Sequence, residues 1–249
     1  SRAEPKLVVV DLVLEKLYQK LIPNHYTTLH RSLLQFRKSQ TPIVMAVALK
    51  DSSAGGDPGN RAAIPTLEEV FPYPAMQAIL RGEQYYGSAL VQKDADGVLR
   101  RQSMDYVSCT NCSPSMLARI YQQFNKNPLP GLIDFSLGSK FEYVPMQDVV
   151  QWNRDGNVQR IIETFQDKAV FIGTVTRFED RHMAPVALTN WGGTNKQTPG
   201  VLFMAQAMRT IDSGGLIQPA SDWITLILLA CAIGLWFGAG SLRMGLVTL

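Results

Sequence analysis

The sequence predicts an α/β fold, with one mixed-sheet domain and flanking helices, followed by a transmembrane helix. Three runs of aliphatic, largely β-branched residues indicate buried strands, at residues 7–13, 42–49 and 168–175. An amphipathic pattern at residues 28–38 indicates a helix between the first two strands. Strand, helix and strand at this spacing predict a βαβ unit with a parallel strand pair.

Local signals predict the remaining elements. Two β-prone runs, at residues 84–92 and 98–108, flank a turn at residues 93–97 and are expected to pair as a hairpin. A helix is predicted at residues 113–124, with Ser113 or Ser115 as its N-cap. The other expected elements are short strands at 132–135 and 141–144, helices at 145–152, 158–165 and 201–213, and a long irregular stretch at 176–199.

Composition excludes several classes of protein. The chain has 249 residues, of which 46% are hydrophobic and 18% charged, with a net charge of +3. No basic stripe is present, so we expect no nucleic-acid partner. Three cysteines are too few for a small scaffold held by disulfides. P-loop, dinucleotide-binding and serine-nucleophile motifs are absent from the sequence, so we expect no enzymatic activity and no cofactor.

An uncharged segment near the C-terminus predicts a membrane span. Residues 223–242 carry no charged side chain, and a helix of that length covers about 30 Å, the thickness of a bilayer core. Arg243 follows it, which places residues 1–220 outside the cytoplasm by the positive-inside rule. Residues 243–249 are expected to form a turn and the start of a second span. The chain has no initiator Met or cleavable signal peptide, and is therefore interpreted as a fragment of a longer membrane protein.

Polar residues near two strand ends are the candidate ligand contacts. Asp96, Arg100 and Arg101 lie in and after the predicted hairpin turn. Arg100 and Arg101 point to opposite faces of a strand, so at most one faces inward, where Asp11 or Asp180 would be its partner. Asp180 and His182 follow a buried strand, at the place where open α/β sheets bind ligands. Asp11, in the first predicted strand, is the sixth candidate ligand contact. Calcium would need more carboxylates than the turn offers, and no metal site is expected.

Cys109 and Cys112 form a Cys-x-x-Cys pair between a predicted strand and a predicted helix. A thioredoxin-type redox pair occupies this position, because a helix N-terminus stabilises a thiolate. A structural disulfide outside the cytoplasm is the alternative, as are two free thiols. Zinc would need two further ligands that the sequence does not supply.

Several motifs in order resemble those of one family. They are Val8-Val-Val-Asp11, Pro42-Ile-Val-Met-Ala46, Asp94-Ala-Asp-Gly-Val-Leu-Arg-Arg101, Pro114-Ser-Met-Leu-Ala118, Lys168-Ala-Val-Phe-Ile-Gly-Thr174, Asp180 to Pro185, Pro199-Gly-Val to Ala207, and Ser213-Gly-Gly-Leu-Ile-Gln-Pro219. Together they resemble the second class of CHASE domains, sensory extracellular domains associated with cyclases and histidine kinases. That family usually has another strand and helix before residue 7, so the domain is expected to be N-terminally incomplete.

The resemblance implies a bacterial sensory input domain in the cell membrane. It would detect an unknown small-molecule or protein signal and control a cytoplasmic output module in the same polypeptide, an adenylate or diguanylate cyclase or a protein kinase, as in two-component systems. A homodimer is expected. Two other functions stay open: an exported thiol-disulfide oxidoreductase that uses Cys109 and Cys112, and a scaffold that dimerises without sensing.

Overall fold

The computed structural model describes residues 4–12, 25–38, 41–51, 67–70, 77, 80, 82–89, 91, 93–104, 113–176, 180–191 and 197–247. The chain divides into two units, Ser1–Leu216 and Ile217–Leu249. The strands are β1 (Leu7–Asp11), β2 (Ile43–Asp51), β3 (Leu67–Val70), β4 (Tyr86–Ser88), β5 (Arg101–Gln102), β6 (Gly131–Leu132), β7 (Ala169–Gly173), β8 (Arg181–Met183) and β9 (Gln197–Pro199). The helices are α1 (His25–Lys38), the 3-10 turn η3 (Glu83–Tyr85), α3 (Met116–Gln123), α4 (Met146–Arg154), α5 (Val158–Phe165), α6 (Gly200–Asp212) and α7 (Asp222–Val247).

The main sheet of the first unit is mixed, as predicted. Its described strands follow the order β3-β2-β1-β7, and β4 also pairs with β2. β1 lies parallel to β2, with Val9 opposite Val44, and parallel to β7, with Val9 opposite Phe171. β3 runs antiparallel to β2. The predicted βαβ unit is therefore confirmed as β1, α1 and β2, and β1 is an inner strand with parallel neighbours on both sides.

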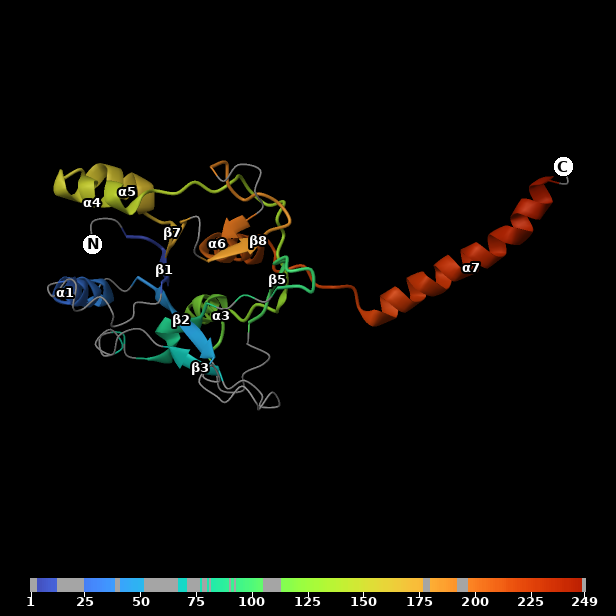
Figure 1. Ribbon diagram of the computed structural model, residues 1–249, viewed down its shortest axis with the longest axis horizontal. Coiled ribbons are helices and arrows are strands. Elements are labelled where there is room, and N and C mark those ends of the chain that lie inside the picture. Colours follow the sequence, from blue (N-terminus) through green and yellow to red (C-terminus); the bar gives the residue numbers. More distant parts are fainter. Residues whose placement is uncertain are drawn as a thin grey trace, which may run out of the picture. The chain divides into compact units, whose positions relative to one another are not determined.

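Helices cover both faces of this sheet (Figure 1). On one face, Leu7 and Val9 pack in a core with α3 and α6, whose Phe203 is fully buried. On the other face, Val8 and Met45 pack in a second core with Leu33 of α1. Because side chains alternate along a strand, Asp11 follows Leu7 and Val9 onto the face of α3 and α6.

β7 differs from its prediction as a strongly buried strand. All five of its residues are partly exposed, and among the described strands it pairs with β1 alone. The neighbouring helices α4 and α5 have no buried residues. The aliphatic sequence of β7 predicted the strand correctly, but burial depends on what covers both faces, which a run of residues does not specify.

The helices around the site have the predicted caps. Ser115 is the N-cap of α3, and its hydroxyl accepts a hydrogen bond from the Ala118 amide at 3.2 Å. α6 ends before Gly214 and Gly215, which both have positive φ, and the Gly215 amide donates to the Thr210 carbonyl. Two glycines are suited to this position, because the left-handed backbone after a helix strains other residues.

The predicted hairpin is wrong, although its turn is present. The Gly97 amide donates to the Asp94 carbonyl at 2.8 Å, and the Asp94 amide donates to the Val98 carbonyl at 3.0 Å. In the part of these runs that the structure describes, the strands do not pair with each other: β4 joins β2, and β5 joins β6. β4 is fully buried, and a Cβ on Gly87 would lie 2.6 Å from Cα of Met116. β4 is therefore held between β2 and the start of α3, where its neighbours are distant in the sequence.

The second unit contains α7. The helix predicted at residues 222–242 is confirmed, and it continues to Val247, through the turn expected after residue 242. Its side chains that are described, up to residue 236, are exposed, among them Trp223 and Trp236. No helix in the described part of the chain is long and apolar enough to cross a membrane. The predicted membrane span is therefore not confirmed.

Candidate functional site

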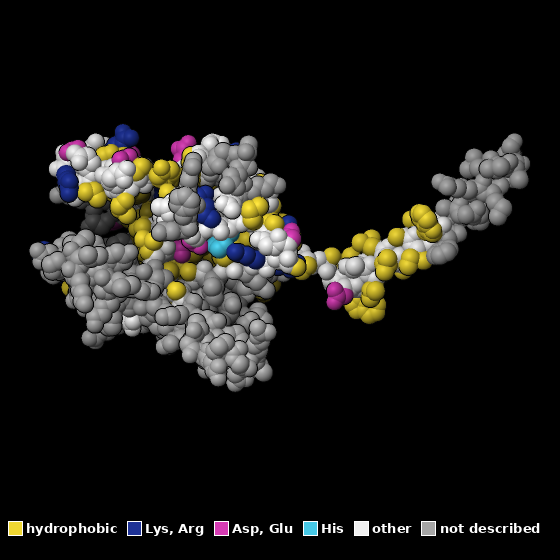
Figure 2. Space-filling view, in the orientation of Figure 1, with side chains coloured by type: hydrophobic (Ala, Val, Ile, Leu, Met, Phe, Trp, Pro, Cys, Tyr) yellow, Lys and Arg dark blue, Asp and Glu magenta, His cyan; other side chains and the backbone are white. Residues whose placement is uncertain are grey.

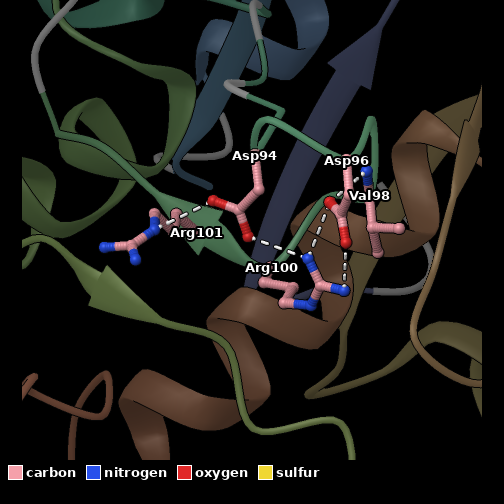
Figure 3. Close-up of polar contacts among 5 residues, drawn as sticks. All are labelled: Asp94, Asp96, Val98, Arg100 and Arg101. Carbon is pink, nitrogen blue, oxygen red and sulfur yellow. Dashed lines mark hydrogen bonds and ion pairs between the residues drawn. The ribbon is translucent and has the colours of Figure 1, made fainter.

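The turn before β5 is held by a network of ion pairs (Figure 3). The Arg100 guanidinium donates to Asp94 at 3.1 Å and to Asp96 at 2.7 Å. The Arg101 Nε donates to Asp94 at 2.9 Å. Asp96 also accepts the Val98 amide at 3.1 Å. Two carboxylates of the turn therefore hold both arginines that follow it.

These contacts correct the partner expected for an inward arginine. Arg100 and Arg101 pair with Asp94 and Asp96 and not with Asp11 or Asp180. The hydrogen bond from Arg100 lowers the pKa of Asp96 to about 2, and the same contact raises the pKa of Arg100. Because the pairs are exposed, they contribute little to stability. We interpret the network as one that shapes the turn.

A second cluster lies where β1 ends. Asp11 is the last residue of β1, in register with Gly173 of β7. Asp180 precedes β8, and one of its carboxylate oxygens lies 2.9 Å from Nε2 of His182. In the space-filling view, histidine atoms reach the surface beside acidic and basic side chains (Figure 2). The structure thus brings together Asp11, Asp180 and His182, three of the six predicted ligand contacts.

Burial shifts the pKa of Asp11. The pKa of Asp11 is raised to about 7, mainly because burial disfavours the charged carboxylate. The negative charge of Asp180 raises the pKa of Asp11 further, and His182 partly offsets both effects. His182 has only 14% of its side chain exposed, and its Nδ1 is buried with no hydrogen-bond partner among the described residues. Asp11 therefore exchanges a proton in the neutral pH range.

The other three predicted contacts, Asp96, Arg100 and Arg101, remain in their own cluster. The two clusters are adjacent through the backbone, because the Leu99 amide donates to the Met183 carbonyl at 2.9 Å. Among the described residues, the ion pairs of these side chains stay within each cluster. The six predicted contacts therefore form two clusters and not a single site.

Two residues of this region were missed in the sequence. Gly200 begins α6, and a Cβ at this position would overlap the Asp180 carboxylate. Phe203 of α6 packs edge-on against the His182 ring, with centroids 5.9 Å apart. A glycine directly after a proline at a helix start was the available signal for Gly200. Phe203 gave none, because a buried aromatic residue in a helix is ordinary core.

A groove lies on the opposite face of the sheet from Asp11. It has a volume of about 1640 Å³ and is lined mainly by apolar side chains, including Val8 and Val10 of β1, Leu33 of α1, Ile172 of β7 and Phe165 of α5. The groove also reaches around β7 to α6. It coincides with the incomplete burial of β7 and α5.

The cysteine pair cannot be placed in this arrangement. Cys109 and Cys112 lie outside the described residues. Cys231 of α7 is a free, exposed cysteine. Within the described ranges, no group of three His, Cys, Asp or Glu residues is arranged to hold a metal ion.

The polar cluster lies at the carboxyl end of β1, an inner strand with parallel neighbours, and this is the edge at which open α/β sheets bind ligands. Comparison with family models identifies a CHASE2 domain, matched over residues 1–242. The chain therefore belongs to the CHASE2 family of sensory extracellular domains in signalling proteins, as the motifs predicted. No curated protein and no solved structure matches the chain.

Proposed function

We propose that the chain is the extracytoplasmic input domain of a membrane-bound bacterial signalling protein. α7 would anchor it in the membrane, and a cytoplasmic output module in the same polypeptide, a nucleotide cyclase or a protein kinase, would receive the signal. The CHASE2 match over residues 1–242 is the observation that carries this proposal. The uncharged residues 223–242 within one continuous helix support the membrane anchor.

The contacts of α6 support a transmitting role for this helix. Gln206 is fully buried, and its side-chain amide donates to the carbonyls of Asp134 and Leu137, at 2.6 and 3.2 Å. The Tyr121 hydroxyl of α3 donates to Asp212 at 2.8 Å. α6 is thus fixed to the rest of the first unit near its C-terminal end, and residues 213–221 connect it covalently to α7. A signal that binds two arrangements of the first unit differently would shift α6 and pull on this connection.

The signal and the partners are part of the proposal. Asp11, Asp180 and His182 are the proposed contacts for a signal, because Arg100 and Arg101 are engaged by their own turn. A homodimer would let two α7 helices respond together. The signal would be a small ligand or a protein outside the cytoplasm.

The experiment is removal of the sensory unit from the full-length protein. Residues 1–216 are replaced by a flexible linker, and the activity of the output module is measured in membranes against a panel of external stimuli. A variant with Asp155→Asn, an exposed carboxylate at the end of α4, serves as a folded control. We expect the replacement to abolish a response that the control retains. If the output still responds to every stimulus without residues 1–216, the proposal is wrong.

A further inference from the structure

Asp11 ends β1 in register with Gly173, whose Cβ position lies against Val201 in the first turn of α6. Asp180 lies against the adjacent Gly200 and is hydrogen-bonded to His182, so three ionisable side chains are placed where β1 ends and α6 begins. We propose that this cluster is a proton-binding site through which external pH acts on α6, with Asp11 as the group that takes up the proton. This inference rests on the proposed sensory function and names the proton as a signal. It concerns Asp11, Asp180 and His182, none of which lines the apolar groove.

The cluster contacts α6 at two points. Asp180 lies against Gly200, where no Cβ would fit, and its carbonyl accepts the Gly200 amide at 2.9 Å. His182 packs against Phe203, which is fully buried, one turn further along the helix. A change in the position of Asp180 or His182 therefore acts directly on the first turn of α6.

Asp180 is held in an unusual backbone conformation, with φ of 45°. This left-handed region is unfavourable for residues other than glycine, although Asp adopts it more readily than most. The hydrogen bond to His182 and the Gly200 amide hold Asp180 in place. Contacts that maintain a strained residue are suited to a switch, because weakening one of them releases the strain.

The electrostatic surroundings of Asp11 contain one repelling and one offsetting group. Asp180 raises its pKa and His182 lowers it, while burial dominates. β7 and the first turn of α6 contribute no ionisable side chain. Arg181 of β8 donates to the carbonyls of Val175, Thr176 and Gln197.

The other charged residues close in sequence to the cluster are either paired with other side chains or outside the described residues. Arg100 is bound by Asp94 and Asp96. Arg177 and Glu179 lie outside the described residues. Among the described residues, no arginine or lysine forms an ion pair with Asp11. We therefore expect the charge of Asp11 to be neutralised by uptake of a proton.

The cycle has two states. Above neutral pH, the ionised Asp11 is repelled by Asp180, the residue that His182 contacts through Nε2. Below neutral pH, the Asp11 carboxylate takes up one proton from solvent and the repulsion ends. Nδ1 of His182 has no hydrogen-bond partner among the described residues, so the ring is positioned by Asp180 at Nε2 and by its packing on Phe203.

The test uses the complete chain in detergent micelles, with protons as the only ligand. The ¹³C shift of the Asp11 carboxyl carbon is followed from pH 4 to 9, assigned by its absence in Asp11→Asn. Hydrogen exchange of the first-turn amides of α6 is measured over the same range. We expect a midpoint near pH 7, with a parallel change in α6 protection that Asp11→Asn lacks and the control Asp155→Asn retains.

A second variant keeps the test informative without removing Asp11. Because His182 lowers the pKa of Asp11, His182→Gln is expected to move the carboxyl midpoint to higher pH. The inference is overturned if the Asp11 carboxyl titrates below pH 5, or if protection of α6 follows the same pH profile in wild type and Asp11→Asn. Such a result leaves the sensory function intact if replacement of residues 1–216 still abolishes a response to another stimulus.

Discussion

The raised pKa of Asp11 predicts that its carboxylate destabilises the folded protein at alkaline pH. The unfolded chain releases this proton near the ordinary value of 3.8, whereas the folded protein retains it until about pH 7. Between these values the folded state binds more protons than the unfolded state, so stability falls as pH rises. Replacing Asp11 with Asn keeps the shape of the protonated carboxyl and removes its charge.

The size of the effect follows from the shift. A change from 3.8 to about 7 corresponds to about 4 kcal/mol, as an upper limit. Asp11→Asn is therefore expected to raise the free energy of unfolding at pH 8 by up to this amount. At pH 4, where Asp11 of the wild type is protonated when folded, the two proteins are expected to differ little.

Urea unfolding of the complete chain in a mild detergent, followed by near-ultraviolet circular dichroism from pH 4 to 8, measures this difference. Asp155→Asn is the matched control, since it removes an exposed carboxylate and is expected to show no such pH dependence. The reasoning is refuted if Asp11→Asn is no more stable than wild type at pH 8, or if its advantage is the same at pH 4.

Three further substitutions test the packing around α6 and α3. Gly200→Ala places a methyl group against the Asp180 carboxylate and is expected to cost about 1–3 kcal/mol; an unchanged unfolding midpoint in urea would contradict the close approach. Ser115→Ala removes the N-cap of α3 and is expected to cost about 1 kcal/mol, whereas Ser139→Ala, a control at an exposed serine, should cost less; equal losses in thermal unfolding would reject the assignment. Tyr121→Phe removes the hydroxyl that is hydrogen-bonded to Asp212, and we expect it to cost about 1–2 kcal/mol. It should also speed hydrogen exchange at the C-terminal end of α6. An unchanged exchange rate there would show that the hydroxyl has only a local role.

The sequence predicted what depends on local pattern. The aliphatic runs predicted β1, β2 and β7 at nearly their observed positions, and the helix predicted at residues 158–165 is α5 with the same bounds, Val158–Phe165. The wrong predictions concern strand pairs whose two members are distant in the sequence. The turn at Asp94–Gly97 was recognised, but β4 pairs with β2, because Gly87 admits the start of α3.

The candidate site was predicted only in part, because local patterns place residues at strand ends but do not specify their distant partners. Asp11, Asp180 and His182 follow strand ends, and strand ends of a parallel sheet meet at one edge. The arginines were assigned to the wrong carboxylates, since alternation along a strand predicts which face a side chain takes and not which partner is nearest. The contact of Asp180 with Gly200 depends on the approach of α6, which no local pattern encodes.

The central claim is that this CHASE2 domain senses a signal outside the cytoplasm and passes it to an output module. The most direct measurement is the output activity of the full-length protein in membrane vesicles as the pH on the side of residues 1–216 is varied from 5.5 to 8.5. We expect a response with a midpoint near pH 7 that is lost both in Asp11→Asn and on replacement of residues 1–216. An identical response in all three proteins would contradict the account.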